Sequence, residues 1–364
     1  MPTYYNEKIE KKYYCKFYYT DWQGIRRQKK KEGFTLARDA KAYEQDFLNK
    51  AAGDCAMKFS ALYENYIEDY KARRKPTSVY CREYAFKKHF LPVFGNMPLT
   101  AITPVTIRKW QNDIISAGYS ATYQHALNAY LSAAFNYAVK YYKLKENPVK
   151  QAGAIGKSHA GRIDFWTLAE FNSFINTLQK SGSPFPKANI NTDILIFAFT
   201  VLFYTGLRIG EFLALTVQDY NPAAQTLNIN KTLAVLNREV IIQPPKTPKS
   251  KLVINLPAKL CAMFDNYIAA MYEPQPQERL FPMLNKLNLS KALKHIAGLA
   301  HIKPIRLHDL RHSHASMLIE LNVSPLAISE RLGHDDVKTT LNTYSHLYPN
   351  KGNELAKKIN GLMP

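Results

Sequence analysis

Residues 194–211 read Ile-Leu-Ile-Phe-Ala-Phe-Thr-Val-Leu-Phe-Tyr-Thr-Gly-Leu-Arg-Ile-Gly-Glu. The apolar part is too short to cross a bilayer, so it predicts a buried helix over residues 191–204 of a globular domain. The arginine that follows, Arg208, is placed beside apolar residues, where a guanidinium is costly without an anionic partner. Two partners remain open: a phosphate, which matches the forked guanidinium, or the nearby carboxylate of Glu211.

A second polar segment lies about 100 residues downstream. Residues 308–314 read His-Asp-Leu-Arg-His-Ser-His. On a helix, His308 and Arg311 share one face, so that one phosphate receives both an imidazole and a charged fork. The alternative uses His308 and His312 as metal ligands four residues apart. However, this segment lacks the Glu that follows the first histidine in zinc protease helices.

The third segment, residues 332–344, reads Leu-Gly-His-Asp-Asp-Val-Lys-Thr-Thr-Leu-Asn-Thr-Tyr. It contains His334 and ends on Tyr344. A lone tyrosine is usually structural, and the chain has 24 of them. Spacing alone therefore does not select Tyr344, and only its combination with the two preceding segments does.

The charge of the chain predicts a polyanionic partner. Lys and Arg number 49 against 29 Asp and Glu, a formal net charge of +20. Residues 1–50, 51–150 and 151–364 carry +5, +7 and +8, so the excess is not confined to a tail. Nucleic acid touched by every part would explain this spread, and a basic enzyme without a nucleic-acid role is the alternative. The four cysteines form no C-x-x-C pair, and the N-terminus lacks a signal-peptide core, which predicts a reduced cytoplasmic protein.

The first 52 residues predict a small sheet followed by a helix. Residues 13–20 are rich in aromatic strand formers, 21–24 suit a hairpin turn, and 25–31 form the returning strand. A helix is expected over residues 35–48. The returning strand carries a basic group that can enter a DNA major groove or form a solvated surface, and it consists of Arg26, Arg27, Lys29 and Lys30.

Residues 55–148 predict an all-helical domain, whose tyrosines at helical spacing are expected in its core. Residues 149–163 are rich in glycine and are expected to be a linker. The domain of residues 164–364 begins with a predicted capping box, Thr167 with Glu170. It continues with helices, three short β-like runs between 226 and 256, and helices again from about 289.

Together, the three segments resemble the tyrosine recombinase, or phage integrase, family. The shared strings are Thr-Gly-Leu-Arg-Ile-Gly-Glu, Leu-His-Asp-Leu-Arg-His and Leu-Gly-His followed ten residues after the histidine by Tyr-Ser-His. The likeness is greatest to integrases of temperate phages and conjugative transposons of Gram-positive bacteria. It implies an α+β, mostly α fold with an arm-type DNA-binding domain (1–52), a helical core-binding domain (55–148) and a mainly helical catalytic domain (164–364).

The resemblance also implies a role for each candidate residue. Arg208 and Arg311 would clamp the scissile phosphate. His308 would hydrogen-bond that phosphate and help remove the tyrosine proton, while His334 would contact the phosphate from the other side. Tyr344 would attack in line and form a 3′-phosphotyrosyl bond, which releases a 5′-hydroxyl.

The family further places a lysine on a β-hairpin turn, where it protonates the departing 5′-oxygen. Lys246 best matches the pattern, and Lys249 remains open because the surrounding loop is proline-rich. Glu211 matches an acidic residue that supports the site. Two arginines and two histidines neutralise a phosphate without a metal or another cofactor, which agrees with the positioning and charge stabilisation that phosphoryl transfer needs.

The function implied is a site-specific DNA recombinase that integrates and excises a mobile element. Its expected partners are double-stranded DNA attachment sites, three further copies in a homotetramer on DNA, and accessory DNA-bending and excision factors. No membrane role is expected, and the location would be cytoplasmic, on the nucleoid. Two alternatives are a metal-dependent nuclease that uses His308, His312 and His314, and a DNA-binding protein without catalysis.

Overall fold

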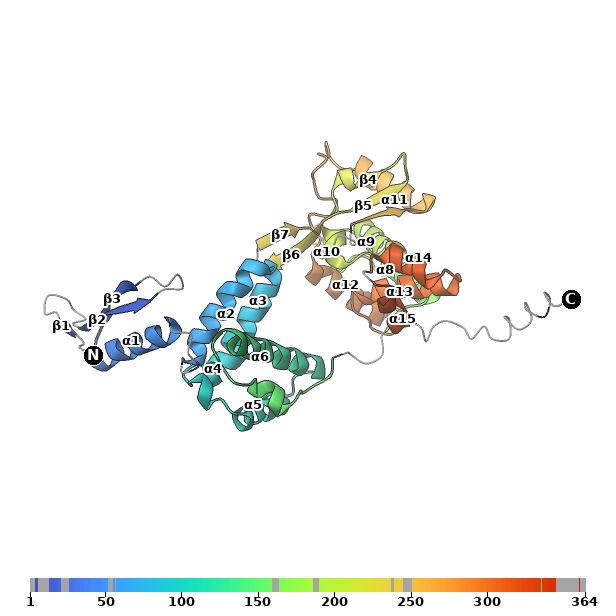
Figure 1. The fold of residues 1–364 in the computed structure, drawn as a ribbon. Helices are drawn as coiled ribbons and strands as arrows, with labels where there is room; N and C mark the ends of the chain where they lie inside the picture. The colour runs from blue at the N-terminus through green and yellow to red at the C-terminus, as the bar shows by residue number, and fades with distance from the viewer. Residues whose placement is uncertain are drawn as a thin grey trace. The chain divides into compact units, whose positions relative to one another are not determined.

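The computed structural model describes residues 4–5, 13–20, 26–51, 55, 57–158, 164–185, 190–236, 239–244, 251–334, 336–344 and 360. The chain divides into two compact units, Met1–Gly161 and Arg162–Pro364. Helices predominate in both, with small antiparallel sheets, which confirms the predicted α+β, mainly α class (Figure 1). Within the described residues, every helix is too short or too polar to span a bilayer.

The N-terminal part is a three-stranded antiparallel sheet with a helix across one face. Its elements are β1 (Tyr4–Tyr5), β2 (Tyr13–Thr20), β3 (Arg26–Phe34) and α1 (Ala37–Ala51). Side chains of a strand alternate between its faces, so Cys15 and Phe17 both point toward α1, where they are buried with Ala40. Both predicted strands and the predicted helix are present, and β3 ends three residues beyond its expected end at residue 31.

A helical bundle follows. Its elements are α2 (Phe59–Arg73), α3 (Pro76–Ala85), the π-helix η1 (Phe86–Phe90), α4 (Leu91–Phe94), the 3₁₀-helix η2 (Leu99–Ala101), α5 (Pro104–Ser116), α6 (Ala121–Tyr141) and α7 (Pro148–Ala152). Phe59, Tyr63 and Tyr66 are buried among other aromatic rings. The tyrosine stripe of α2 therefore belongs to the core, as predicted from its helical spacing.

The predicted linker begins later than residue 149. Asn147 caps α7 by accepting hydrogen bonds from the backbone N–H groups of Val149 and Lys150. Val149, Ala152 and Ile155 are buried in the core of the bundle. Burial of these apolar side chains stabilises their packing on the bundle. The chain therefore belongs to the bundle as far as residue 155, although its composition resembles that of a linker.

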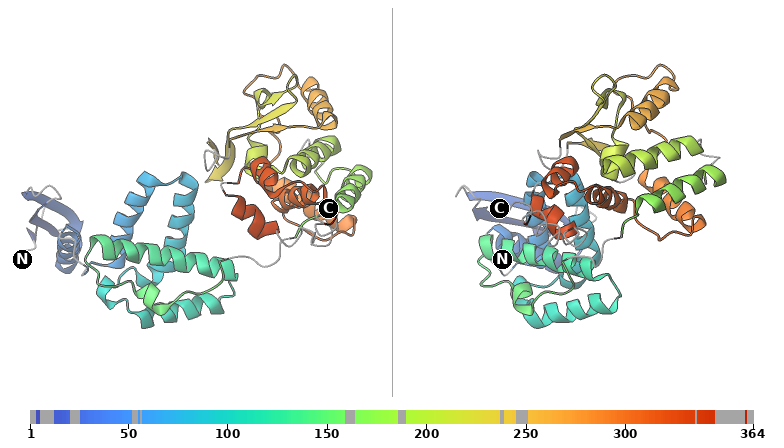
Figure 2. Two further views of the ribbon diagram at one scale, coloured as in Figure 1. Left: turned by 45° about the vertical axis from the view of Figure 1, so that its right-hand side comes forward. Right: turned by 90° about the vertical axis from the view of Figure 1, so that its right-hand side faces the viewer.

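The described residues of the C-terminal unit form helices and two small sheets, and Figure 2 shows them from two further sides. Its helices are α8 (Leu168–Ser181), α9 (Thr192–Thr205), α10 (Ile209–Leu213), the 3₁₀-helix η4 (Val217–Asp219), α11 (Ala258–Ala269), α12 (Lys286–Leu299), α13 (Asp309–Glu320), α14 (Pro325–Leu332) and α15 (Val337–Tyr344). Its strands are β4 (Tyr220–Asn221), β5 (Thr226–Ile229), β6 (Thr232–Leu236), β7 (Glu239–Gln243) and β8 (Leu252–Asn255). The sheets have the orders β4-β5-β8 and β6-β7.

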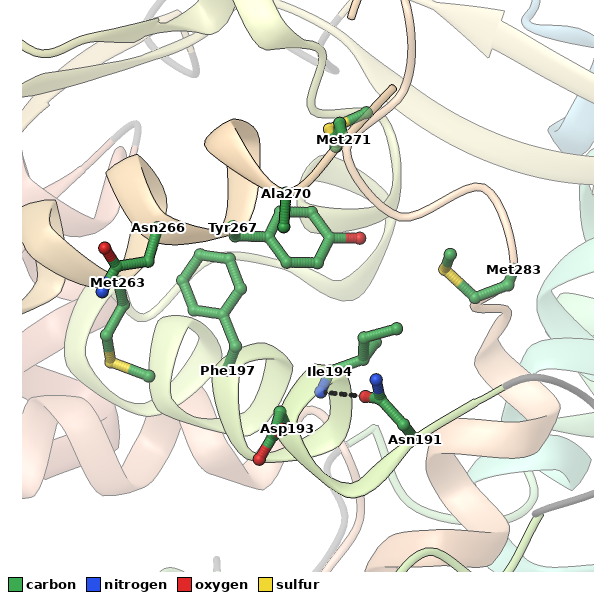
Figure 3. Close-up of a pocket in the computed structure, with 10 residues that line it drawn as sticks. All are labelled: Asn191, Asp193, Ile194, Phe197, Met263, Asn266, Tyr267, Ala270, Met271 and Met283. Atoms are coloured by element: carbon green, nitrogen blue, oxygen red, sulfur yellow. Dashed lines mark hydrogen bonds between the residues drawn. The ribbon is translucent and has the colours of Figure 1, made fainter. Parts of the chain in front are cut away.

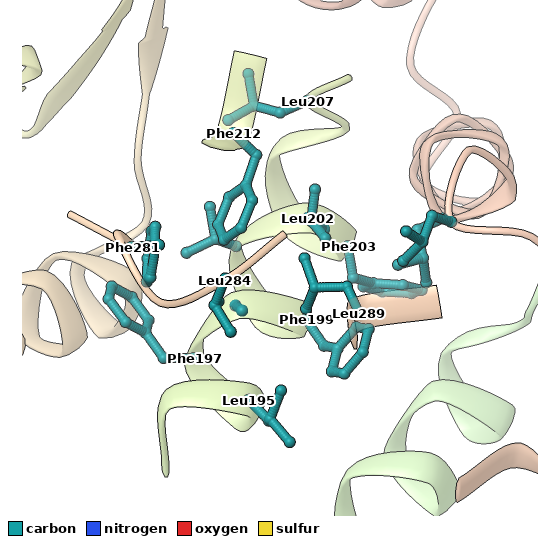
Figure 4. Packing of buried hydrophobic residues seen from close by; sticks show 14 of the residues in the cluster. Leu195, Phe197, Phe199, Leu202, Phe203, Leu207, Phe212, Phe281, Leu284 and Leu289 are labelled. Carbon is teal, nitrogen blue, oxygen red and sulfur yellow. The ribbon is translucent and has the colours of Figure 1, made fainter. Parts of the chain in front are cut away.

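Helix α9 is the apolar centre of this unit, as its sequence predicts (Figure 4). Its Phe203 ring stacks on Phe171 of α8 at 3.9 Å between centroids. On another side, Phe197 meets Phe281 at 5.5 Å. The capping box of Thr167 and Glu170 at the start of α8 is also present. A rigid, buried helix therefore carries the residues that follow Thr205.

The sequence interpretation omitted two helices of this unit, the short α10 and the longer α11. Helix α11 lies between the last strand and the helices expected from about 289. Leu260, Cys261 and Phe264 of α11 are buried in the main core. Their spacing is helical, and the periodicity of these apolar residues was the signal that would have revealed the helix.

Candidate active site

Arg311 is the buried centre of the site. It lies in the first turn of α13, and only 4% of its surface is exposed. Its Nη1 donates to the carbonyl oxygen of Gly206 at 2.9 Å, and its Nη2 donates to that of Leu332 at 2.5 Å. One guanidinium thus joins the ends of α9 and α14 and is held in one orientation.

The two carbonyl acceptors lie at glycine caps. Gly206 ends α9 with φ 67° and Gly333 ends α14 with φ 62°, a left-handed conformation that favours glycine. At Gly206 a Cβ atom would lie 2.7 Å from the His314 ring and 2.8 Å from Leu332. Both the backbone conformation and the close packing therefore require glycine at position 206.

Arg208 caps the start of α10 next to this centre. Its Nη1 donates to Glu211 Oε1 at 2.8 Å, and its backbone N–H donates to Glu211 Oε2 at 3.0 Å. Glu211 is buried, whereas 37% of the Arg208 side chain remains exposed. The ion pair considered from sequence is therefore present, and it orients a guanidinium that solvent still reaches.

The local charge is positive. Burial, together with the charge of Arg208, lowers the pKa of Arg311 to about 10, and Glu211 opposes this shift. An arginine with this pKa remains protonated at neutral pH. Two guanidiniums share one carboxylate, so the cluster retains a positive charge that suits an anion.

Tyr344 is the last residue of α15 and is almost fully buried. Its ring packs with Ala315, Ile319 and Leu332. Its hydroxyl lies 2.5 Å from Nδ1 of His312. Burial raises the pKa of the Tyr344 phenol, and the positive charge of Arg311 opposes this rise. The tyrosine selected by motif is thus brought to the same cluster as Arg311.

His308 occupies the N-cap of α13, where its side chain is exposed to solvent. Its ring lies edge-on to that of His312, with 5.1 Å between centroids. Desolvation by neighbouring groups lowers the pKa of His308, and the charge of Arg311 lowers it further. The lowered pKa favours the neutral form of the His308 imidazole.

His334 follows the glycine cap of α14. Its Nδ1 lies 2.8 Å from Oγ1 of the buried Thr340, which fixes the ring against α15. It is two residues from Leu332, whose carbonyl binds Arg311. The turn between α14 and α15 therefore positions His334 through the same segment that holds Arg311.

The geometry does not favour the metal alternative. His312 is directed to Tyr344, whereas His314 is buried and accepts a hydrogen bond from Nε of Arg331 at 3.1 Å. Burial, together with the charge of Arg331, lowers the pKa of His314 to about 3. Among the described residues, no three His, Cys, Asp or Glu side chains are arranged to hold a metal ion.

Family comparisons agree with this arrangement. Residues 166–351 match the model of the phage integrase family, residues 58–115 that of the phage integrase N-terminal SAM-like domain, and residues 2–51 that of the arm DNA-binding domain. The chain belongs to the phage integrase family. It is a tyrosine-type site-specific recombinase, and neither the nuclease nor the non-catalytic alternative is supported.

Individual relatives are similar over most of their length. The ICEBs1 integrase of Bacillus subtilis is 28% identical over 348 residues, which cover 90% of this chain and 89% of the relative. The integrase of Staphylococcus phage L54a is 27% identical, covering 74% and 82%. The Tn1549 transposon integrase in complex with a circular intermediate DNA has a similar fold, with a TM-score of 0.70 at 18% identity, covering 84% of this chain and 100% of that one.

The lysine expected of a phage integrase lies outside the described residues. Lys246 and Lys249 both fall between β7, which ends at Gln243, and β8, which begins at Leu252. In the described residues β7 pairs with β6 and β8 pairs with β5. The assignment of the general acid to Lys246 or Lys249 therefore stays a prediction.

The four cations predicted for DNA contact lie on two different faces of the N-terminal sheet. Lys30 lies opposite Lys16, and Arg26 stands over the ring of the exposed Tyr18 at 4.7 Å. These groups lie on the open face. Arg27 and Lys29 alternate with them and therefore point to the α1 face, where Lys29 Nζ is 5.7 Å from the Phe47 ring.

An apolar pocket lies at the start of α9 (Figure 3). It has a volume of about 620 Å³, and its lining includes Asp193 at the start of α9 together with Met263 and Met271. The site residues instead follow the other end of α9, a helix of 14 residues and thus about 20 Å long. The pocket is therefore separate from the chemistry of the recombinase.

Proposed function

We propose that this recombinase cleaves DNA through Tyr344 and that Arg208 and Arg311 hold the scissile phosphate. The observation that carries the proposal is the position of the Tyr344 hydroxyl, which lies 2.5 Å from Nδ1 of His312, the residue next to the buried Arg311 on α13. The nucleophile and the positive charge are thereby supplied by elements far apart in sequence. Phosphoryl transfer requires mainly such positioning and charge stabilisation.

The reaction would proceed in two reversible steps. The Tyr344 oxygen attacks phosphorus, the bond to the 5′-oxygen breaks, and a 3′-phosphotyrosyl bond results. Lys246, or Lys249 in its place, would protonate the departing 5′-oxygen. The 5′-hydroxyl of another strand would then attack the phosphotyrosine and return its proton to that lysine. The bond from phosphorus to the Tyr344 oxygen breaks, the tyrosine is released, and the bond energy is conserved as strands are exchanged.

The remaining site residues would support this phosphate. His308 is exposed on the open side of the cluster, which suits a hydrogen bond to a phosphate oxygen. His334, held by Thr340, would contact the phosphate from the other side. Glu211 would keep the Arg208 guanidinium in place through their ion pair, and no metal ion or other cofactor is needed.

The N-terminal sheet would contact a second class of DNA site. Its open face carries Lys16, Arg26 and Lys30 with the rings of Tyr14 and Tyr18. Cations above aromatic rings keep their charge while their position is restricted. This face suits a DNA groove, and Arg27 and Lys29 would then act less directly because they lie on the α1 face.

The biological role we propose is integration and excision of a mobile genetic element. The partners would be double-stranded attachment sites, with four copies of the chain acting on two duplexes. Accessory DNA-bending and excision factors would set direction, and the protein would act on the nucleoid in the cytoplasm. The similarity to integrases of a Bacillus subtilis element and a staphylococcal phage supports this role.

The decisive test uses a nicked suicide substrate that carries the element's own attachment core. Wild-type protein, Tyr344→Phe and the matched control Tyr272→Phe, a tyrosine that is 90% exposed, are incubated with it in EDTA. We expect a covalent protein–DNA band from the wild type and from Tyr272→Phe, and none from Tyr344→Phe. An adduct in Tyr344→Phe, or cleavage that requires a metal and leaves no adduct, would contradict the proposal.

A further inference from the structure

The Tyr344 hydroxyl meets a histidine to which the family resemblance gives no catalytic role. The resemblance assigns the tyrosine proton to His308, yet the side chain in contact with the hydroxyl is His312, at 2.5 Å through Nδ1. Their rings lie 5.6 Å apart between centroids. His312 projects from α13 directly after Arg311, so the helix that fixes the buried guanidinium also fixes this contact.

Resting on the proposed function, we propose that His312 is the general base of strand cleavage. In the tautomer with the proton on Nε2, Nδ1 accepts the hydrogen bond from the Tyr344 hydroxyl. As the tyrosine oxygen forms its bond to phosphorus, the O–H bond breaks and Nδ1 takes the proton. The phosphorus–5′-oxygen bond breaks, and the leaving oxygen is protonated by the general acid.

The reverse step uses the same proton. When a 5′-hydroxyl attacks the phosphotyrosine, it returns its proton to the deprotonated general acid. The phosphorus–tyrosine bond breaks, and the tyrosine oxygen recovers the proton from the His312 imidazolium. A recombinase must break and rejoin strands at similar rates, and a histidine that both accepts and returns a proton meets that need. His308 then remains free for a phosphate oxygen, because its exposed N-cap position faces solvent.

The groups around His312 explain why it would act only with DNA present. Burial and the neighbouring His308 lower its pKa to about 4, Arg311 and Arg306 lower it as well, and Asp309 opposes them. A base this weak is a poor acceptor for a phenol proton. A phosphate that enters beside Arg311 adds negative charge, which raises the pKa of His312 toward the neutral range where general bases work best.

The test compares single-turnover rates of covalent adduct formation by the full-length protein from pH 5.5 to 9.5. The variants are His312→Ala and His312→Asn, with His295→Ala as a matched control because His295 is an exposed histidine of α12. At pH 7 we expect His312→Ala to be about 10²- to 10³-fold slower than the wild type, the usual contribution of a general base. The control should match the wild type.

Two further results separate a base from a positioning group. The rate of His312→Ala should rise about tenfold per pH unit as hydroxide replaces the histidine, while the wild-type rate changes less. Asn offers an acceptor oxygen near the place of Nδ1 but does not take a proton, so His312→Asn should stay slow. Thermal midpoints and DNA affinity are measured for both variants, and His312→Asn carries the test if the alanine variant is unfolded.

The proposal fails if His312→Ala cleaves as fast as the wild type or faster, because the contact then only restrains the tyrosine. It also fails if His312→Asn restores the wild-type rate, or if high pH does not rescue His312→Ala. These outcomes all presuppose a wild-type adduct that Tyr344→Phe lacks. If the wild type forms no adduct, the proposed function itself is contradicted, so the two failures are distinguishable.

Discussion

The basic residues of the active site and those of the N-terminal sheet are held in opposite ways. Arg311 is buried and donates to two backbone carbonyl groups, and Arg208 is held by a buried carboxylate. In the sheet, Arg26 and Lys30 are solvent-exposed and lie over tyrosine rings. The first arrangement fixes a charge at one point, whereas the second distributes charge over a surface.

This difference predicts different responses to substitution. A phosphate that is to be attacked must be held to within a fraction of an ångström, which requires guanidiniums in one orientation. Binding a DNA backbone requires only enough positive charge along a groove, so single cations are interchangeable. Substitutions in the active site should therefore cause large, geometry-dependent losses, and substitutions in the sheet should cause small, salt-dependent ones.

The largest effect is expected from Arg311→Lys, which keeps the charge and removes the fork. A lysine ammonium does not reproduce two fixed donors to Gly206 and Leu332 together with a phosphate contact. Adduct formation on a core-site suicide substrate should fall by about 10³-fold, the upper range for loss of one charge-stabilising donor. Arg38→Lys, at an arginine that is 83% exposed, is the control. A loss below tenfold would show that charge without geometry is sufficient.

A stability test at Gly206 examines the backbone that presents one of these carbonyls. Gly206→Ala introduces a Cβ atom 2.7 Å from His314 and forces alanine into a left-handed conformation. We expect a loss of about 2–4 kcal/mol from strain and overpacking together, seen as a lower thermal midpoint of the full chain.

The matched control is Gly298→Ala in the last turn of α12. A Cβ atom there meets nothing within 4 Å, so helix propensity should make this change neutral or stabilising. If both variants unfold at the wild-type temperature, the glycine cap is not what fixes the carbonyl that binds Arg311.

Local sequence patterns predict the elements of the fold better than they predict the residues of the active site. The buried helix over residues 191–204 is predictable because its apolar run is long, and the sheet is predictable from its aromatic residues. The chemistry depended on motif resemblance, since no local pattern distinguishes Tyr344 among 24 tyrosines. The contact between His312 and Tyr344 joins residues 32 apart, and only the packing of α15 against α13 reveals it.

Two features of the structure have physical causes that amino-acid composition does not show. Residues 149–155 contain glycine and read as a linker, but their apolar side chains complete the core of the helical bundle. Alternation along β3 also places the four cations predicted for DNA contact on two faces, which their number alone does not show. In both cases tertiary neighbours decide the outcome, and these lie outside the local window.

A pH titration tests the buried histidines of the catalytic unit. The pKa of His314 is lowered to about 3, whereas an unfolded histidine has a pKa near 6.5. Below pH 6.5 the unfolded chain therefore binds a proton that the folded chain does not, and stability falls as the pH falls toward 3. His314 alone should contribute a loss of about 2 kcal/mol between pH 6.5 and pH 5.

The measurement is the thermal midpoint of the full chain at pH 7 and pH 5, for the wild type and His314→Gln. The glutamine variant should be less stable at pH 7 but lose less on acidification, because it has no proton to gain. An equal loss in both proteins would show that His314 is not the group that titrates. His295→Gln, at an exposed histidine of α12, is the control substitution.

The smallest effect is expected on the sheet, where one face is compared with the other. Arg26→Ala with Lys30→Ala removes two cations from the open face, and Arg27→Ala with Lys29→Ala removes two from the α1 face. If the open face contacts phosphates, the first pair should weaken arm-site DNA binding about tenfold and reduce the salt slope by about 2, close to one counterion per lost contact. The second pair should change the DNA affinity and the salt slope less, because side chains on the α1 face would affect binding only through the net charge. Both pairs change the net charge equally. Identical losses of affinity would therefore mean that the sheet acts through its total charge. A larger loss from the first pair would assign the groove contact to the open face.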